Sequence, residues 1–224
     1  MDDEQHAGIA EQLRRVTALQ DIEAYRCDQQ ALDAADRLLD LVEAGALLAR
    51  GRTMHARLVR GEETDARELS LFERAAELYR GAGDARGEAE ALFWLATCHQ
   101  TVRRDDDAAL PHFLRSRELA ELAGDKLTLS CIVRHLGFLD VNAGRLPEAR
   151  KHLEASVRLR REIGFDAGAA AGMVALAELA LDDGDPKRAR DVLDEAERLA
   201  TDSGADGVLR LIANVRTQHG ESLG

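Results

Sequence analysis

The sequence has few of the residues that break helices, cross-link small folds or build aromatic cores. Among 224 residues there are three prolines, three cysteines and 4% aromatic residues. Scarce proline and a hydrophobic content dominated by Ala, Leu and Val favour helices over strands, so we predict an all-α fold. Three cysteines without regular spacing exclude a disulfide framework and indicate reduced thiols, which favours a cytoplasmic protein.

Long apolar runs and an excess of basic charge are also missing. No window approaches eighteen apolar residues and the start, MDDEQH, is acidic, so we expect neither a membrane span nor a signal peptide. With 42 acidic and 30 basic side chains the net charge is −12. This charge argues against nucleic acid and against an anionic membrane surface as the main partner.

Four glycines recur at a nearly constant interval. Gly83, Gly124, Gly164 and Gly204 lie 41, 40 and 40 residues apart, and each follows an apolar-periodic run. Glycine is favoured just after a helix because it adopts the left-handed conformation without a Cβ penalty. The spacing therefore predicts a helical repeat of about 40 residues.

A second pattern recurs in phase with these glycines, with small and large residues at helical spacings. Its members are the pairs Leu95-Ala96, Leu136-Gly137 and Leu176-Ala177, the alanines Ala109, Ala149 and Ala189, then Phe113, Leu153 and Leu193 at +4, Ser116, Ser156 and Ala196 at +7, and Leu119, Leu159 and Leu199. Spacings of 3, 4 and 7 keep residues on one helical face. Small residues at a crossing let two helices approach closely, and large ones fill the groove beside it.

This order of small and large positions resembles the tetratricopeptide repeat over residues 85–204, with half a repeat at 64–83. The resemblance implies antiparallel helix pairs stacked into a right-handed superhelical solenoid. The period exceeds the standard 34 residues, the usual aromatic is replaced by His99, Asp140 and Ala180, and the closing proline is absent. The long period resembles the repeats of MalT-type and antibiotic-regulator-type bacterial proteins. Armadillo and HEAT repeats share the period and are the structural alternative.

We divide the chain into three parts. Residues 1–63 form an N-terminal helical region, either a cap or degenerate repeats, 64–204 carry the repeats, and 205–224 form a closing helix and a tail. In the first part we expect helices at 2–20 and 22–50, with Asp21 as N-cap, a bend near Gly45, continuation over 54–59 and a turn at 61–65. Further helices are predicted at 66–79, 88–102, 107–123, 126–143, 147–163, 167–181, 186–201 and 207–218. Pro147 and Pro186 suit first-turn positions, where no N–H is needed.

The family resemblance implies that the first helix of each pair lines a concave groove that holds a peptide, a partner helix or a small apolar ligand. The corresponding binding residues are Glu90, Phe93, Thr97, Gln100, Cys131, Arg134, Phe138, Val141, Asn142, Val174, Glu178 and Leu181, with Thr101, Ala171 and Asp182 on the same face. Trp94 is added as a candidate anchor or, equally, an inter-helix packing residue. Only Arg134 and Asn142 match the residues with which family members clamp a C-terminal carboxylate, so we do not expect that clamp.

Three further groups have a structural explanation that we prefer. Cys98, His99, Cys131 and His135 could suit zinc, but adjacent side chains diverge and no CxxC pair exists, so we predict no metal and no other cofactor. His99 and Asp140 fall at equivalent repeat positions and could form either a general-base pair or a polar core contact. The basic run of Arg145, Arg150, Lys151, Arg158, Arg160 and Arg161 is interrupted by Glu, which indicates a solvated outer face.

No phosphate loop, nucleophile elbow or HExxH motif is present, which favours a non-catalytic protein. We therefore predict a protein–protein interaction module or scaffold in a regulatory or biosynthetic assembly. The alternative is a small-molecule receptor or an unusual enzyme that uses the apolar groove. A third hypothesis is a homodimer formed through the terminal helices.

Overall fold

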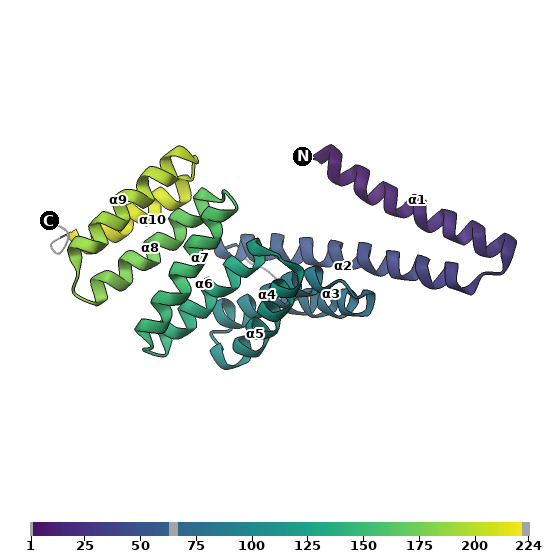
Figure 1. Cartoon of the computed structure of the whole chain (residues 1–224), viewed down its shortest axis with the longest axis horizontal. Coiled ribbons are helices and arrows are strands. Elements are labelled where there is room, and N and C mark those ends of the chain that lie inside the picture. The colour runs from purple at the N-terminus through teal and green to yellow at the C-terminus, as the bar shows by residue number, and fades with distance from the viewer. Residues whose placement is uncertain (1, 63–66, 221–224) are drawn as a thin grey trace. The chain divides into compact units, whose positions relative to one another are not determined.

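The computed structural model describes residues 2–62 and 67–220, and side chains from residue 8 onward. This described part of the chain is all-α, as predicted, with no strand (Figure 1). Its helices are α1 (Asp2–Arg26), α2 (Gln29–Val59), α3 (Glu68–Ala82), α4 (Ala85–Thr97), the π-helical turn η1 (Cys98–Val102), α5 (Asp106–Ala123), α6 (Lys126–Asn142), α7 (Leu146–Glu162), α8 (Asp166–Asp182), α9 (Pro186–Asp202) and α10 (Asp206–Gln218). Within the described ranges, no helix is both long enough and apolar enough to cross a lipid bilayer.

The chain divides into two compact units, residues Met1–Leu119 (unit 1) and Ala120–Gly224 (unit 2). In unit 2, α6 pairs with α7 and α8 with α9, and α10 packs against α8 and α9 (Figure 1). In unit 1, α2 packs against both α1 and α3, and α3 packs against α4. The boundary between the units falls inside α5.

Unit 2 is built on a strict step of 20 residues, half of the predicted period. Its helices begin at residues 126, 146, 166, 186 and 206, and four of them contain 17 residues. Each turn places a glycine at positive φ, and the next backbone N–H donates to a carbonyl five residues back, as Phe165 does to Arg160 at 2.8 Å. This is the Schellman end of a helix, in which glycine relieves the left-handed position. Gly124, Gly164 and Gly204 have this role as predicted, and Gly144 and Gly184 have it as well.

The predicted helix crossings form the core. Ala149, Leu153, Ala189 and Leu193 have no exposed surface. A Cβ added to Gly137 would lie 3.0 Å from the Leu153 side chain, so the two helices approach closely at this crossing and a larger residue would need Leu153 to shift. Close packing of this kind leaves no room for an added methyl group unless a neighbour shifts.

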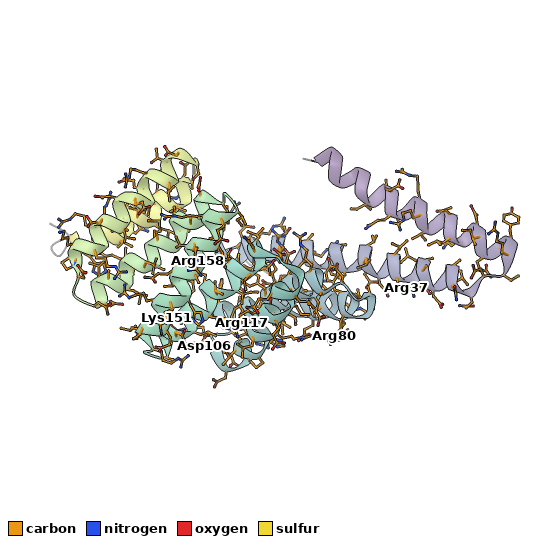
Figure 2. All side chains as sticks on the ribbon, viewed as in Figure 1. Arg37, Arg80, Asp106, Arg117, Lys151 and Arg158 are labelled. Carbon is orange, nitrogen blue, oxygen red and sulfur yellow. The ribbon has the colours of Figure 1, made fainter. Side chains whose placement is uncertain are left out.

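One basic residue does not follow the predicted outer face. Arg158 and Lys151 project from α7 (Figure 2) and are exposed. Arg160 is buried, and its Nη1 donates to the carbonyl oxygen of Gly168 at 2.7 Å. The prediction of a solvated face is therefore wrong for Arg160, which bonds the start of α8 to α7. It lies four residues after Ser156, on the buried side of the helix.

The predicted break at Asp21 is also wrong. The first helix continues to Arg26, Cys27 has φ 51°, and Asp28 is the N-cap whose carboxylate accepts from the backbone N–H of Gln30 at 3.0 Å. The second helix then runs without interruption through Gly45 to Val59. In the predicted turn at 61–65, Gly61 has φ 78°, and residues 63–65 lie outside the described ranges.

The α2–α3 hairpin has the same crossing as the later pairs. Gly51 on α2 faces Phe72 on α3, and a Cβ at Gly51 would lie 2.5 Å from that ring. Phe72 and Ala75 are completely buried, like Leu153 and its neighbours in unit 2. The small-against-large arrangement therefore reaches into the N-terminal region, where the sequence pattern was too weak to predict it.

A single extra residue explains why the first glycine interval is 41 rather than 40. In η1 the backbone N–H of Arg103 donates to the carbonyl of Cys98, five residues back, where an α-helix would use four. The helix end that follows has Arg104 at φ 55°, and the N–H of Asp105 donates to His99. Arg104 thus occupies, 20 residues before Gly124, a position that glycine holds elsewhere.

The two glycines in the interior of α2 predict opposite effects of alanine. Gly51→Ala drives a Cβ into the Phe72 ring and should destabilise the protein by about 1–2 kcal/mol, after a partial offset from helix propensity. Gly45→Ala meets only ordinary contact with Tyr79 at 3.6 Å and should stabilise it by about 0.5–1 kcal/mol. Denaturant unfolding followed by circular dichroism measures both, and equal shifts in the same direction would contradict the packing.

Relief of the left-handed position at Arg104 gives a second prediction. Arg104→Gly should stabilise the protein by about 0.5–1 kcal/mol, because a non-glycine residue at positive φ costs about 1–2 kcal/mol and glycine gives part of this back as chain entropy. The matched control is Arg103→Gly, at φ −86°, which should destabilise. Thermal melts of the two variants decide the point, and a lower melting temperature for Arg104→Gly would count against it.

Candidate ligand groove

A pocket of about 280 Å³ lies in unit 2 on the first helices of its two hairpins and on the last helix, α10. It is lined by residues of α6, α8 and α10, namely Arg134, Phe138, Ala171, Val174, Ala175, Glu178, Leu211, Asn214, Val215 and Gln218. The helices present these side chains together because residues at spacings of 3, 4 and 7 share one face. The lining residues on α10 are Leu211, Asn214, Val215 and Gln218, and they show this spacing in the sequence. The sequence pattern predicts only that this helix closes the stack.

Arg134 gives the pocket its positive charge. Its guanidinium carbon lies 4.7 Å from the centre of the Phe138 ring, and its Nε is buried without a hydrogen-bond partner in the described part of the chain. Burial and the neighbouring Arg160 lower the pKa of Arg134 to about 10, so the side chain is still charged at neutral pH. A buried donor without a partner costs free energy, which a ligand oxygen would recover.

Glu178 gives the pocket an acidic group. Desolvation and the nearby Asp182 raise the pKa of Glu178, while His219 and Arg134 act against this rise. No ion pair joins Arg134 to Glu178 within the described ranges. The two charges are therefore available to different groups of a ligand, with the apolar side chains of Phe138 and Leu211 also on the lining.

Of the predicted binding residues in unit 2, four line this pocket and four do not. Arg134, Phe138, Val174 and Glu178 are part of the lining, while Cys131, Val141, Asn142 and Leu181 are not. Val141 packs against the cluster that contains Ala149, and Leu181 packs against the core of the last hairpin. Cys131 is half-buried and lies 3.7 Å from the Arg160 guanidinium.

The predicted binding residues in unit 1 are mostly engaged within the unit. Trp94 stacks at 6.0 Å on Phe72 and meets Phe93 edge-on at 5.2 Å, so the packing explanation for this tryptophan describes its contacts. Phe93, Thr97 and Gln100 are buried. Glu90 is half-buried, and its carboxylate accepts from Arg52 at 2.9 Å.

The two residues considered as a general-base pair have partners within their own units. His99 stacks on His112 at 5.6 Å in unit 1. Asp140 in unit 2 accepts from Arg145 at 2.8 Å and bonds His152 at 2.7 Å. Asp140 is therefore a buried carboxylate with two polar partners in its own hairpin, and neither of them is His99.

Three polar residues that we did not connect in the sequence meet in unit 1. His55 Nδ1 lies 2.6 Å from Glu68 Oε1, and the Cys98 thiol donates to the same oxygen at 3.0 Å. All three side chains are buried. They come from α2, α3 and η1, and His55 and Glu68 lie in the part of the sequence where the repeat pattern was weakest.

Comparisons with known proteins agree with this architecture. Residues 128–202 match the family model for the tetratricopeptide repeat. A search of curated proteins found no match. Among solved structures, the chain resembles the crystal structure of BtubC (BKLC) from P. vanneervenii with a TM-score of 0.51 and 16% sequence identity, over 88% of this chain and 91% of that chain.

At that identity the structural likeness concerns the fold alone. The family match covers α6 except for its first two residues, and the whole of α7, α8 and α9. These are the two hairpins with the strict 20-residue step and the small-against-large crossings. The comparisons and the fold together support a tetratricopeptide-repeat assignment for residues 128–202.

Proposed function

We propose that the protein is a non-catalytic interaction module whose groove on α6, α8 and α10 binds a segment of a partner protein. Tetratricopeptide repeats generally mediate protein–protein interaction, and the family match covers the hairpins that form most of this groove. The observation that carries the proposal is the pocket itself, which lies partly on α6 and α8, the helices that the family resemblance assigns to binding, and partly on α10. The 40-residue period supports the further proposal that the repeats are of the long, MalT-like variety.

The size of the pocket favours one anchoring side chain over a whole small molecule. Its volume of about 280 Å³ lies at the lower end of small-molecule sites, which span roughly 300–1,000 Å³. A peptide or a partner helix needs only such a pocket for its central residue, since the rest of the segment lies along the groove. The receptor or enzyme alternative requires a larger enclosed space.

The charges of the pocket specify the chemistry of the segment. Arg134 offers a buried, unpartnered Nε and a cationic guanidinium, which suit a carboxylate. Phe138, Val174 and Leu211 suit a large apolar side chain. We therefore infer an acidic residue next to a large apolar one in the bound segment. One arginine reads one acidic side chain here, which differs from the multi-residue clamp for a C-terminal carboxylate.

The inferred recognition predicts a selective loss of binding in Arg134→Met, which keeps the aliphatic stem but removes the charge. Peptides selected on the full-length protein from a displayed random library should share an acidic residue beside a large apolar one. Their affinity for Arg134→Met should fall by about 10-fold or more, because a hydrogen bond to a charged group contributes about 1.5–3 kcal/mol. Fluorescence anisotropy with a labelled peptide measures the change.

The matched control is Arg158→Met on α7, an exposed arginine outside the pocket (Figure 2). It should leave the affinity unchanged, whereas Phe138→Ala should weaken binding like Arg134→Met. Failure to enrich any peptide, or equal binding to Arg134→Met and wild type, would sink the proposal. If a metabolite panel instead gives a thermal shift that Phe138→Ala abolishes, the receptor alternative is correct.

A further inference from the structure

The buried cluster of His55, Glu68 and Cys98 in unit 1 combines three different metal-binding atoms. An imidazole nitrogen, a carboxylate oxygen and a sulfur lie within 4.8 Å of one another. The three residues have exposed fractions of 8%, 6% and 3%. Three separate helical segments supply them, so any ion held between them would join α2, α3 and the end of α4.

Glu68 occupies a position that the repeat otherwise reserves for a fully buried alanine. It precedes Phe72 by four residues and Ala75 by seven, as Ala149 precedes Leu153 and Ser156. Ala149 has no exposed surface. The crossing of the two helices therefore places a carboxylate in unit 1 where unit 2 has a methyl group.

Cys98 and His55 also stand at positions where unit 2 has apolar residues. Cys98 follows Glu68 by 30 residues, as Leu179 follows Ala149. His55 follows the crossing glycine, Gly51, by four residues, as Val141 follows Gly137. In sequence, α2 and α3 are separated by eight residues (60–67) and α6 and α7 by three (143–145), which explains why His55 and Glu68 are further apart than Val141 and Ala149.

In unit 2 the three equivalent residues form part of the apolar core. Ala149 and Leu179 belong to one buried apolar cluster, and the partly buried Val141 packs against it. These three positions are therefore apolar in unit 2, although the same hairpin also buries the carboxylate of Asp140, which bonds His152. Burying a carboxylate costs several kcal/mol unless hydrogen bonds or a positive charge compensate it, and the apolar residues of unit 2 show that packing alone does not require the polar trio.

The backbone also departs from the repeat at this point. Cys98 is the first residue of the π-helical turn η1, which contains the extra residue of the 41-residue interval. Such turns are rare and occur frequently at functional sites. The irregularity and the polar substitutions therefore coincide at the same place in the fold, although they are independent features of the chain.

Aromatic packing encloses the cluster on one side. The Trp94 ring meets the His55 ring edge-on at 5.4 Å. The Arg52 guanidinium lies over the Trp94 ring, 5.6 Å from its centre. Burial and the Glu68 carboxylate raise the pKa of the Cys98 thiol, and this thiol donates a hydrogen bond to Glu68. An ion in the cluster would replace these internal hydrogen bonds.

We propose that His55, Glu68 and Cys98 bind one divalent transition-metal ion of the zinc class. Zinc accepts imidazole nitrogen, carboxylate oxygen and thiolate sulfur at about 2.0–2.3 Å, which separates the ligand atoms by roughly 3–4 Å. The present separations of 2.6 and 3.0 Å therefore need to open by about 1 Å, and the His55 and Cys98 ligand atoms already lie within 4.8 Å of each other. On binding, Cys98 releases its proton to solvent, and Zn²⁺ balances the two negative charges of Glu68 and the thiolate. The ion would clamp the three helices of unit 1 together.

Cobalt substitution tests this proposal on the full-length protein. After treatment with a chelator, titration with Co²⁺ should give one equivalent bound per chain and a thiolate-to-cobalt charge-transfer band, which Zn²⁺ should abolish by displacement. Mg²⁺ should have no effect, because it prefers all-oxygen sites. Absence of the band from folded wild-type protein would overturn the proposal.

Variants locate the site. Cys98→Ser should remove the band, and Glu68→Gln should weaken metal affinity by about 100-fold or more, since even an outer-shell partner contributes 10- to 100-fold. The matched control Cys131→Ser should retain the band with unchanged stoichiometry. The triple variant His55→Val, Glu68→Ala, Cys98→Leu gives unit 1 the apolar residues found at the equivalent positions of unit 2. It should therefore fold and bind no metal. A band that survives in Cys98→Ser, or is lost in Cys131→Ser, would overturn the assignment.

Discussion

The close approach of two paired helices at a small residue is the constraint on which the rest of the structure depends. Gly137 lies against Leu153 and Gly51 against Phe72, and a Cβ would lie 3.0 Å from the Leu153 side chain and 2.5 Å from the Phe72 ring. Because the large partner is fully buried at each crossing, the position of one helix on the other is fixed. The 20-residue step then follows in unit 2, since 17-residue helices and three-residue turns bring equivalent residues to every crossing.

The same constraint decides which residues are free to bind. The second helices supply the buried alanines and leucines of the crossings, such as Ala149 and Leu193. The first helices have a further face, and in unit 2 that face forms the pocket around Arg134 and Phe138. The interaction function that we propose therefore depends on side chains that the packing of the hairpins does not use.

Much of the helical architecture could be predicted from the sequence, because crossings and turns have strong local patterns. The glycines at 124, 164 and 204 and the alanines at 149 and 189 were assigned correctly. Half of the predicted binding residues of unit 2 line the pocket, because helical periodicity predicts a face but not which of its members the next hairpin covers. Val141, for example, packs into the core. The sequence pattern does not reveal the polar trio, because Glu68 stands in place of the alanine that marks the repeat. In addition, five more residues separate α2 from α3 than α6 from α7, which shifts His55 out of phase.

The trio and the π-helical turn show how one crossing can be changed without loss of the hairpin. In unit 2 the equivalent position is apolar, and this comparison is the basis for assigning a special role to the polar version. The comparison requires that Val141, Ala149 and Leu179 meet at the crossing in unit 2. Nuclear Overhauser spectroscopy on methyl-labelled protein tests it directly: the account predicts cross-peaks that link the methyl groups of Val141, Ala149 and Leu179, and their absence from a folded, well-dispersed spectrum would contradict it.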